Sequence, residues 1–242
     1  MSATAAIVVI GAEVLSAKLV DENGPFLLDA LRKRGIDVRE LRVIGDDVDT
    51  IAKTVRELAA AHGTVITTGG VGPTHDDVTI EGVAAAFGTA VHRNSDLVTR
   101  ISGYYGDTLQ QAALKMAEVP VGSVVQVAPN TGFVPIIRMN NVYILPGVPS
   151  LVRRCYRAIE NELAHGTFFT QALYFNVVES FIADTLTDVQ RSYPDVAIGS
   201  YPRFDDAGYL VKVTLDGRDH AKVDAASTAL HDRIDPEWFT KP

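Results

Sequence analysis

The chain has 242 residues, of which 47% are hydrophobic and 21% are charged, and its formal net charge at pH 7 is −8. This length and composition are typical of a globular protein that buries one large core, or one large core and a small one. The acidic charge argues against a nucleic-acid partner and against an anionic membrane surface, because both require a basic footprint.

The sequence also shows no membrane or export signal. Apolar runs such as "AAIVVI" are far shorter than the roughly 18 residues that a membrane span needs, and no basic segment with a cleavage site follows the first methionine. We therefore expect a cytoplasmic protein with no membrane partner. Because Cys155 has no second cysteine to pair with in this chain, we expect no disulfide and no thiolate zinc cluster, and we expect the thiol to be inert.

The first part of the chain alternates between strand and helix patterns. A continuous apolar run closed by glycine predicts a buried strand at residues 5–11, and two further strands are predicted at residues 36–45 and 63–70. We expect the first helix to begin with Asn23 as its N-cap and to end at Gly35, and a second helix, capped by Asp49, to reach Ala61. This order predicts an α/β fold with a three-layer, mostly parallel sheet and helices on both faces, which binds ligands beyond the carboxyl ends of its strands.

The second part is less regular. We predict helices over residues 78–117, broken near Gly88 and Gly103, and then strands at residues 124–129, 133–139 and 141–147 before a helix that begins at Pro149. From residue 173 the pattern changes to a β-α-β-β-α unit, with strands at 173–179, 196–200 and 208–215 and helices at 180–192 and 219–234. We therefore expect two domains, residues 1–168 and residues 169–242.

The stretch "TTGGVGPTHDDVT", residues 67–79, is the least ordinary part of the sequence. It lacks the lysine of a P-loop and the third glycine of a dinucleotide fingerprint. One interpretation is a tight strand-to-helix turn in which Asp76 or Asp77 caps the helix. The other is a phosphate site made by backbone N–H groups at a helix N-terminus. The two interpretations are compatible.

Carboxylates recur where the predicted strands end. Glu13 follows the first strand, Asp46 and Asp47 follow the second, and Asp76 and Asp77 follow the third. A parallel sheet would bring all of them to one edge, where a hard divalent cation could join them to phosphates. Taken one at a time, each is better explained as a helix cap or a solvated loop residue than as a metal ligand, and only their joint placement favours the metal site. His75 is a further candidate contact, whereas no His-x-x-x-His pair and no Gly-x-Ser-x-Gly elbow occurs.

Five motifs together resemble a known family. The segments "GAEVLSAKLVDEN", "GDD", "TTGGVGPTHDDVT", "ALKMAEVPVG" and "LPGVPS" are similar to the molybdopterin-binding type domain of the competence/damage-inducible protein A family and of the N-terminus of eukaryotic FAD synthases. The resemblance covers about residues 7–163. Residues after 173, with "ES" and "GSYP", resemble the small KH-type α+β domain that follows in that family. The chain reads "NTGFVP" where the family has a glycine-rich segment, so we expect an altered substrate-facing loop.

The resemblance implies a pyrophosphatase that depends on a divalent metal (Mg, Mn or Co) and hydrolyses ADP-ribose or FAD-like dinucleotides. The alternative is a molybdopterin-binding or molybdopterin adenylyltransferase-type protein, including a non-catalytic binding module. Asp77 matches the aspartate that serves pterin binding and nucleotidyl transfer in related adenylyltransferases, although their early Ser-Asp motif is absent here. The implied partner is a small nucleotide or pterin, and the resemblance favours a homo-oligomer.

The expected site residues follow from these motifs. Asp77 is expected to be catalytic, assisted by Asp76 and Asp47, and the same three carboxylates are the expected metal ligands. The expected substrate-binding residues are Gly11, Glu13, Asn23, Thr68, Gly69, Gly70, Gly72, Pro73, Thr74, Lys115, Pro146 and Gly147. The C-terminal unit is not expected to bind RNA, because it is acidic and has no Gly-x-x-Gly clamp.

Overall fold

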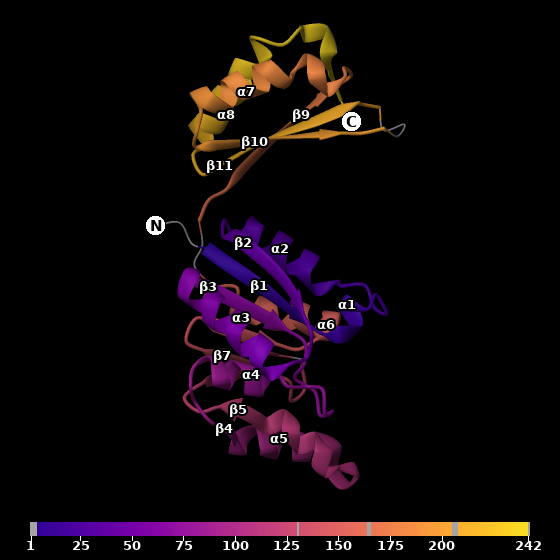
Figure 1. The fold of residues 1–242 in the computed structure, drawn as a ribbon, viewed down its shortest axis with the longest axis vertical. Helices are drawn as coiled ribbons and strands as arrows, with labels where there is room; N and C mark the ends of the chain where they lie inside the picture. The colour runs from indigo at the N-terminus through magenta and orange to yellow at the C-terminus, as the bar shows by residue number, and fades with distance from the viewer. Residues whose placement is uncertain (1–3, 130, 164–165, 205–207, 242) are drawn as a thin grey trace. The chain divides into compact units, whose positions relative to one another are not determined.

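The computed structural model describes residues 4–129, 131–163, 166–204 and 208–241. The chain divides into two compact units, Met1–His165 and Gly166–Pro242, so the division lies close to the boundary expected at residue 168. Figure 1 shows the elements of each unit. In the described residues, no helix combines the length and the apolar character that crossing a membrane would require.

A six-stranded sheet forms the centre of the N-terminal unit, in the order β2-β1-β3-β8-β7-β6. Its strands are β1 (Thr4–Ile10), β2 (Asp37–Ile44), β3 (Thr64–Thr68), β6 (Val124–Val127), β7 (Pro135–Met139) and β8 (Val142–Leu145). Strands β1, β2, β3 and β8 are parallel to one another, as expected. Strand β7, however, pairs antiparallel with both of its neighbours, β8 and β6. The sheet is therefore mixed. A tight turn explains the reversal, because only Asn140, with φ +54°, and Asn141 separate β7 from β8.

Helices cover both faces of this sheet. Alternate residues of β1 point to opposite sides, so Val8 and Ile10 pack with α3 and α4, whereas Ile7 and Val9 pack with α2 and α6. The three expected layers are thus present (Figure 1). The helices are α1 (Ala12–Leu15), α2 (Asn23–Lys33), α3 (Val48–Ala61), α4 (Thr79–Ala86), α5 (Ser95–Tyr105) and α6 (Pro149–Ile159).

Two helix caps differ from the sequence prediction. Asn23 is the first residue of α2, not its cap, and the carboxylate of Asp21 accepts hydrogen bonds from the N–H groups of Asn23 and Gly24. Helix α3 is capped by Asp47, not by Asp49, since Asp47 Oδ1 accepts from Thr50 N at 2.8 Å. The N-cap of α2 is Glu22, which makes no side-chain hydrogen bond. In both helices the carboxylate that accepts from N–H groups of the first turn lies two residues before the residue that was expected to do so.

The segment between α4 and β6 contains more than the two expected helices. Helix α5 passes through Gly103 and ends at Tyr105, and its C-cap Gly106 has a φ of +52° that suits a residue without Cβ, so the break predicted near Gly103 lies at Gly106 instead. Two short strands, β4 (Val91–Arg93) and β5 (Glu118–Pro120), pair antiparallel and were not predicted. Two 3₁₀ segments, η1 (Gly106–Thr108) and η2 (Gln111–Ala117), connect α5 to β5.

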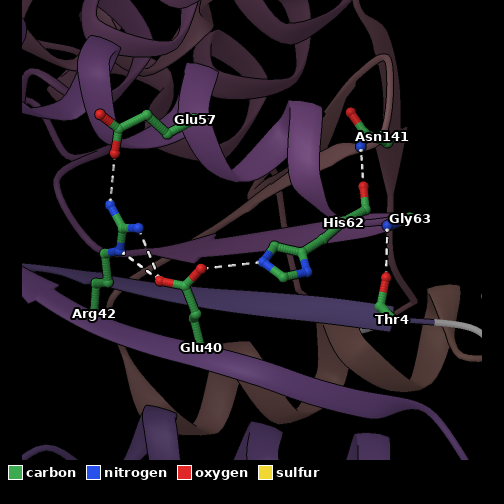
Figure 2. Close-up of polar contacts among 7 residues, drawn as sticks. All are labelled: Thr4, Glu40, Arg42, Glu57, His62, Gly63 and Asn141. Atoms are coloured by element: carbon green, nitrogen blue, oxygen red, sulfur yellow. Dashed lines mark hydrogen bonds and ion pairs between the residues drawn. The ribbon is translucent and has the colours of Figure 1, made fainter.

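The edge strand β2 carries a charged cluster, shown in Figure 2. Arg42 donates to the carboxylates of Glu40, on the same strand, and Glu57, on α3, at 2.8 and 2.9 Å. His62 lies 3.3 Å from Glu40. These contacts lower the pKa of Glu40, chiefly through the hydrogen bond from Arg42. Charges on an edge strand oppose pairing with another sheet, so we assign this cluster a structural role.

The C-terminal unit has a four-stranded antiparallel sheet in the order β10-β11-β9-β12. Its elements are β9 (Phe169–Phe175), η3 (Glu179–Phe181), α7 (Ala183–Ser192), β10 (Val196–Pro202), β11 (Val211–Gly217), α8 (His220–His231), η4 (Pro236–Trp238) and β12 (Phe239–Thr240). Both α7 and α8 pack on the sheet around one apolar core (Figure 1). The β-α-β-β-α order is as predicted, except that β9 begins earlier and β12 is additional. The KH-type assignment stays a prediction.

Candidate functional site

The parallel strands end at one edge of the sheet, where their backbones approach closely. Gly69 follows β3 with φ +101°, and a Cβ atom at this position would lie 2.1 Å from the carbonyl oxygen of Ile10. Gly147 follows β8, and a Cβ atom there would lie 3.3 Å from Gly69 Cα. The end of β1 and the turns after β3 and β8 can therefore meet only because Gly69 lacks a side chain and Gly147 adds none between them.

The glycine turn after β3 is anchored by the helix that follows it. Thr79, the first residue of α4, donates its hydroxyl to the Gly69 carbonyl at 2.8 Å and its N–H to the Gly70 carbonyl at 2.9 Å. Gly70 has φ +62°, and a Cβ atom there would lie 2.4 Å from the Thr79 hydroxyl oxygen. The turn itself thus requires glycine at this position, whether or not a ligand binds.

Thr74, Asp76 and Asp77 form a compact polar group on this turn. The Asp77 carboxylate accepts from Thr74 N at 2.9 Å, and the Thr74 hydroxyl lies 2.5 Å from Asp77 Oδ2 and 2.6 Å from Asp76 Oδ1. The hydrogen bond from Thr74 lowers the pKa of Asp76. Helix α4 has Val78 as its N-cap, with no side-chain hydrogen bond. The interpretation of Asp76 or Asp77 as its helix cap is therefore wrong.

The other strand-end carboxylates have different surroundings. Asp47 caps α3, and hydrogen bonding from Thr50 lowers its pKa. Asp46 is directed to the site instead: Oδ2 accepts from Ala12 N at 2.7 Å, and Oδ1 lies 3.4 Å from the position that a Gly70 Cβ would occupy. Glu13 folds back over Gly11, with Oε1 2.6 Å from the corresponding Cβ position. Asp46, not Asp47, therefore faces the glycine turn.

A cavity of about 490 Å³ opens at this edge of the sheet. The structure brings together around it Glu13, Gly69, Gly70, Gly72, Asp77, Lys115, Pro146 and Gly147, all of them expected substrate-binding or catalytic residues. Among the described residues, the lining does not include Gly11, Asn23, Asp47, Thr68, Pro73, Thr74, His75 or Asp76. The side chain of His75 is 98% exposed, and its Nδ1 is 4.0 Å from the Asp76 carboxylate.

Sequence reasoning missed most of the cavity wall. The wall is largely apolar and comes from loops, strands and helices that are distant in sequence: Leu19, Val71, Ile80, Met116, Phe133, Val134, Pro135, Ile137, Ile144, Val148, Pro149 and Leu151. Some signals were available, because Leu19, Val71, Met116, Val148 and Pro149 lie within the five motifs, and "NTGFVP", which stands where the family has glycines, contributes Phe133, Val134 and Pro135. Glu118, within "ALKMAEVPVG", and Glu81, which lies outside the motifs, also line the cavity.

Lys115 connects η2 to the glycine turn. Its ammonium group donates to the Thr74 carbonyl at 3.0 Å and lies 3.6 Å from Glu81 Oε1. The second oxygen, Glu81 Oε2, is buried and has no hydrogen-bond partner in the part of the chain that the structure describes. The cavity thus holds a cation beside an incompletely satisfied carboxylate, which is an arrangement suited to a polar ligand.

The carboxylates do not form a closed metal cage. Over the described ranges, no group of three or more His, Cys, Asp or Glu side chains is placed to hold an ion. Asp76 and Asp77 nevertheless converge on the Thr74 hydroxyl. Mg²⁺ is commonly held by one or two carboxylates together with substrate phosphates. This donor set therefore fits an ion that binds together with a phosphate ligand.

The two units match separate protein families. Residues 6–165 match the family described as "Probable molybdopterin binding domain". Residues 167–242 match the family described as "FAD synthase, middle domain". The boundary between the two matches coincides with the division of the structure into its two compact units.

Individual relatives agree with these matches. A "Probable FAD synthase" of Caenorhabditis elegans is 31% identical over 96% of this chain and 50% of its own length. A protein of Archaeoglobus fulgidus is 34% identical over 91% of this chain and 93% of its own length. The solved structure of the protein CinA from Thermoplasma acidophilum, titled as of unknown function, superposes with a TM-score of 0.61 at 32% identity, covering 66% of this chain and 98% of that one.

These relatives differ in length. The chain spans about half of the nematode protein but nearly all of the archaeal one. The match to the first family covers more than half of the chain and includes every strand that contributes to the cavity. The chain therefore belongs to the family described as the probable molybdopterin binding domain.

Proposed function

We propose that the chain is a divalent-metal-dependent pyrophosphatase that hydrolyses the diphosphate of ADP-ribose or of FAD-like dinucleotides. The observation that carries this proposal is the composition of the cavity. Its lining combines the glycine turn, Asp77 and Lys115 with a largely apolar wall. A dinucleotide has the same two parts, since a charged diphosphate joins groups that carry flat aromatic rings.

The diphosphate would lie against the glycine turn. Backbone N–H groups can approach a phosphate closely where no Cβ intervenes, and Gly70 and Gly72 supply such positions. Lys115 adds a positive charge at the same place. Because this lysine is also bonded to the Thr74 carbonyl, its side chain is already oriented before a ligand binds, which lowers the entropy cost of binding.

The apolar wall would hold one ring system of the ligand. Met116, Phe133, Ile137 and Ile144 all line the cavity. Such surfaces accept adenine, flavin or pterin rings through apolar and stacking contacts. The wall therefore supports binding of a ring-containing ligand without deciding which ring it is.

Asp76 and Asp77 would hold the divalent ion, which when bound stabilises negative charge on the phosphates and activates a water molecule. Thr74 keeps the two carboxylates oriented toward each other, since its hydroxyl contacts both. Asp46, fixed by Ala12 N, is the third carboxylate directed to the turn. Asp47 is left out of this proposal because its carboxylate is engaged at the start of α3.

The second candidate is a molybdopterin-binding protein or a molybdopterin adenylyltransferase. The family description favours it, because this family is named for pterin binding. The same cavity supports it, since molybdopterin carries both a flat pterin ring and a phosphate. The name of the family that matches the C-terminal unit, and that of the nematode relative, instead refer to FAD.

The two candidates are separated by incubating the pure protein with ADP-ribose, FAD or NADH, with and without Mn²⁺ or Co²⁺. We expect metal-dependent release of nucleoside monophosphate from at least one of them, detected by chromatography. Pterin binding is measured in parallel by fluorescence titration. Tight pterin binding together with no turnover of the three dinucleotides would reject the hydrolase and favour the second candidate.

A further inference from the structure

A buried polar network lies directly behind the glycine turn. The side-chain amide of Asn23 donates one hydrogen bond to Thr68 Oγ1 at 3.1 Å and another to the Gly147 carbonyl at 2.7 Å. Thr68 in turn donates its hydroxyl to the Pro146 carbonyl at 2.6 Å. Asn23 is 8% exposed and Thr68 is 1% exposed, so these bonds are shielded from water.

This network joins three segments that are far apart in sequence. Asn23 comes from the start of α2, Thr68 ends β3, and Gly147 follows β8. Gly69 and Gly147 approach each other at this point and have no side chains of their own to fix their separation. Both glycines line the cavity, whereas Asn23 and Thr68 do not.

We propose that Asn23 is a positioning residue, which holds the turn after β8 against the glycine turn and so fixes the wall of the cavity where a phosphate would bind. Asn23 was expected to contact substrate, but its amide hydrogens point to the protein instead. The effect on turnover rests on the proposed hydrolase function. The effect on the backbone of the two turns does not.

The chemistry of the amide makes the proposal specific. Both hydrogens of the Asn23 amide are used, one on each acceptor. An aspartate has the same shape but, when ionised, would place a charge beside the Gly147 carbonyl and could donate no hydrogen bond. Burial and two nearby acceptors favour its neutral form. When protonated, it has one hydrogen to donate and can restore one of the two bonds.

Asn23→Asp should therefore loosen the two turns at high pH and tighten them again as pH falls. Asn23→Ala should loosen them equally at every pH. The charged groups near this position are Asp21, which bonds the N–H of Asn23, and the Glu22–Arg153 ion pair to α6. All three are present in the wild type and in Asn23→Ala as well, so Asn23→Asp is compared with both of these proteins at the same pH.

The chain provides a matched control at the opposite end of the same two strands. The amide of Asn141, just before β8, donates to the carbonyl of Ala59, in the last turn of α3, at 2.9 Å and to that of His62, just before β3, at 2.8 Å. Figure 2 shows the bond to His62. Asn141→Asp thus makes the same chemical change at a similar amide clamp, far along the strands from the cavity. It should lower stability without changing the turns at the cavity.

The experiment measures hydrogen exchange by mass spectrometry and turnover of ADP-ribose with Mn²⁺, at pH 6 and pH 8, for the wild type and the three variants. For Asn23→Asp at pH 8 we expect faster exchange in peptides that contain Gly69 and Gly147, and a loss of kcat/KM on the order of 10²-fold, as for other misplaced binding groups. At pH 6 the exchange rates and kcat/KM of Asn23→Asp should return toward the wild-type values. Asn141→Asp should show neither the faster exchange in these peptides nor the loss of kcat/KM.

Unchanged exchange in both peptides of Asn23→Asp at pH 8 would overturn the proposal, as would unchanged exchange in both peptides of Asn23→Ala. The same loosening in Asn141→Asp would also overturn it, because the effect would then be general destabilisation. A wild type without turnover would reject the hydrolase function alone. In that case the exchange data still decide the role of Asn23.

Discussion

Asp77 and Asp47 are both strand-end aspartates, but the structure gives them different neighbours. Asp77 lines the cavity, whereas Asp47 caps α3. Asp77→Asn keeps the shape and can still accept the Thr74 hydrogen bonds, but it removes the charge that a hard cation needs. We expect it to fold normally and to lose metal-dependent turnover by a factor on the order of 10² or more, which is roughly 3 kcal/mol of transition-state stabilisation.

The measurement is kcat/KM over a range of Mn²⁺ concentrations, together with the melting temperature. Asp47→Asn is the companion variant, because asparagine caps helices as well as aspartate does. We expect this variant to retain turnover. Near-normal activity of Asp77→Asn would remove Asp77 from the chemistry, and a large loss in Asp47→Asn would restore the role that the sequence suggested for that residue.

Cys155 is a second residue whose surroundings make a clear prediction. Burial in α6 raises the pKa of its thiol to about 11. The thiolate is the reactive form, so at pH 8 the thiol is almost entirely protonated as well as inaccessible. We expect a colourimetric thiol reagent to label the folded protein no faster than it unfolds, and to label it at once in urea. Rapid labelling without denaturant would show that α6 packs less tightly than described.

At the scale of elements, the sequence predicted the parallel half of the sheet better than the antiparallel half. β1 and β3 are short apolar runs closed by glycine, and this pattern is specific to buried parallel strands. The direction of β7 depends instead on the turn at Asn140, which has no strong turn motif. β4 and β5 have three residues each, too few to show any periodicity.

The residues of the candidate site also divide into those that the sequence predicted and those that it did not. The glycine turn and its aspartates were predictable, because the glycines that the turn requires and the two carboxylates lie in one contiguous segment, residues 67–79. Asn23 was misplaced, since its local pattern suits a helix cap while its actual partners, Thr68 and Gly147, are distant in sequence. The apolar wall was missed because apolar residues carry no chemical signature until the fold brings them to one place.

At the scale of the whole molecule, the chain carries two units with separate cores and separate family matches. The candidate site lies wholly within the first unit, because all of its lining residues precede residue 152. The site therefore assigns no role to the second unit. The composition of the second unit argues against one class of partner, RNA.

The acidic charge of the second unit predicts that it does not bind RNA. Residues 170–242 contain seven Lys and Arg against twelve Asp and Glu, a net charge of −5, and no Gly-x-x-Gly clamp. Binding of single-stranded RNA depends on cationic contacts to phosphates, which this unit cannot supply in excess. We expect no gel shift of a mixed-sequence single-stranded RNA by micromolar protein at low salt. A shift that weakens as salt is raised would contradict this, since its salt dependence would reveal phosphate contacts that the net charge conceals.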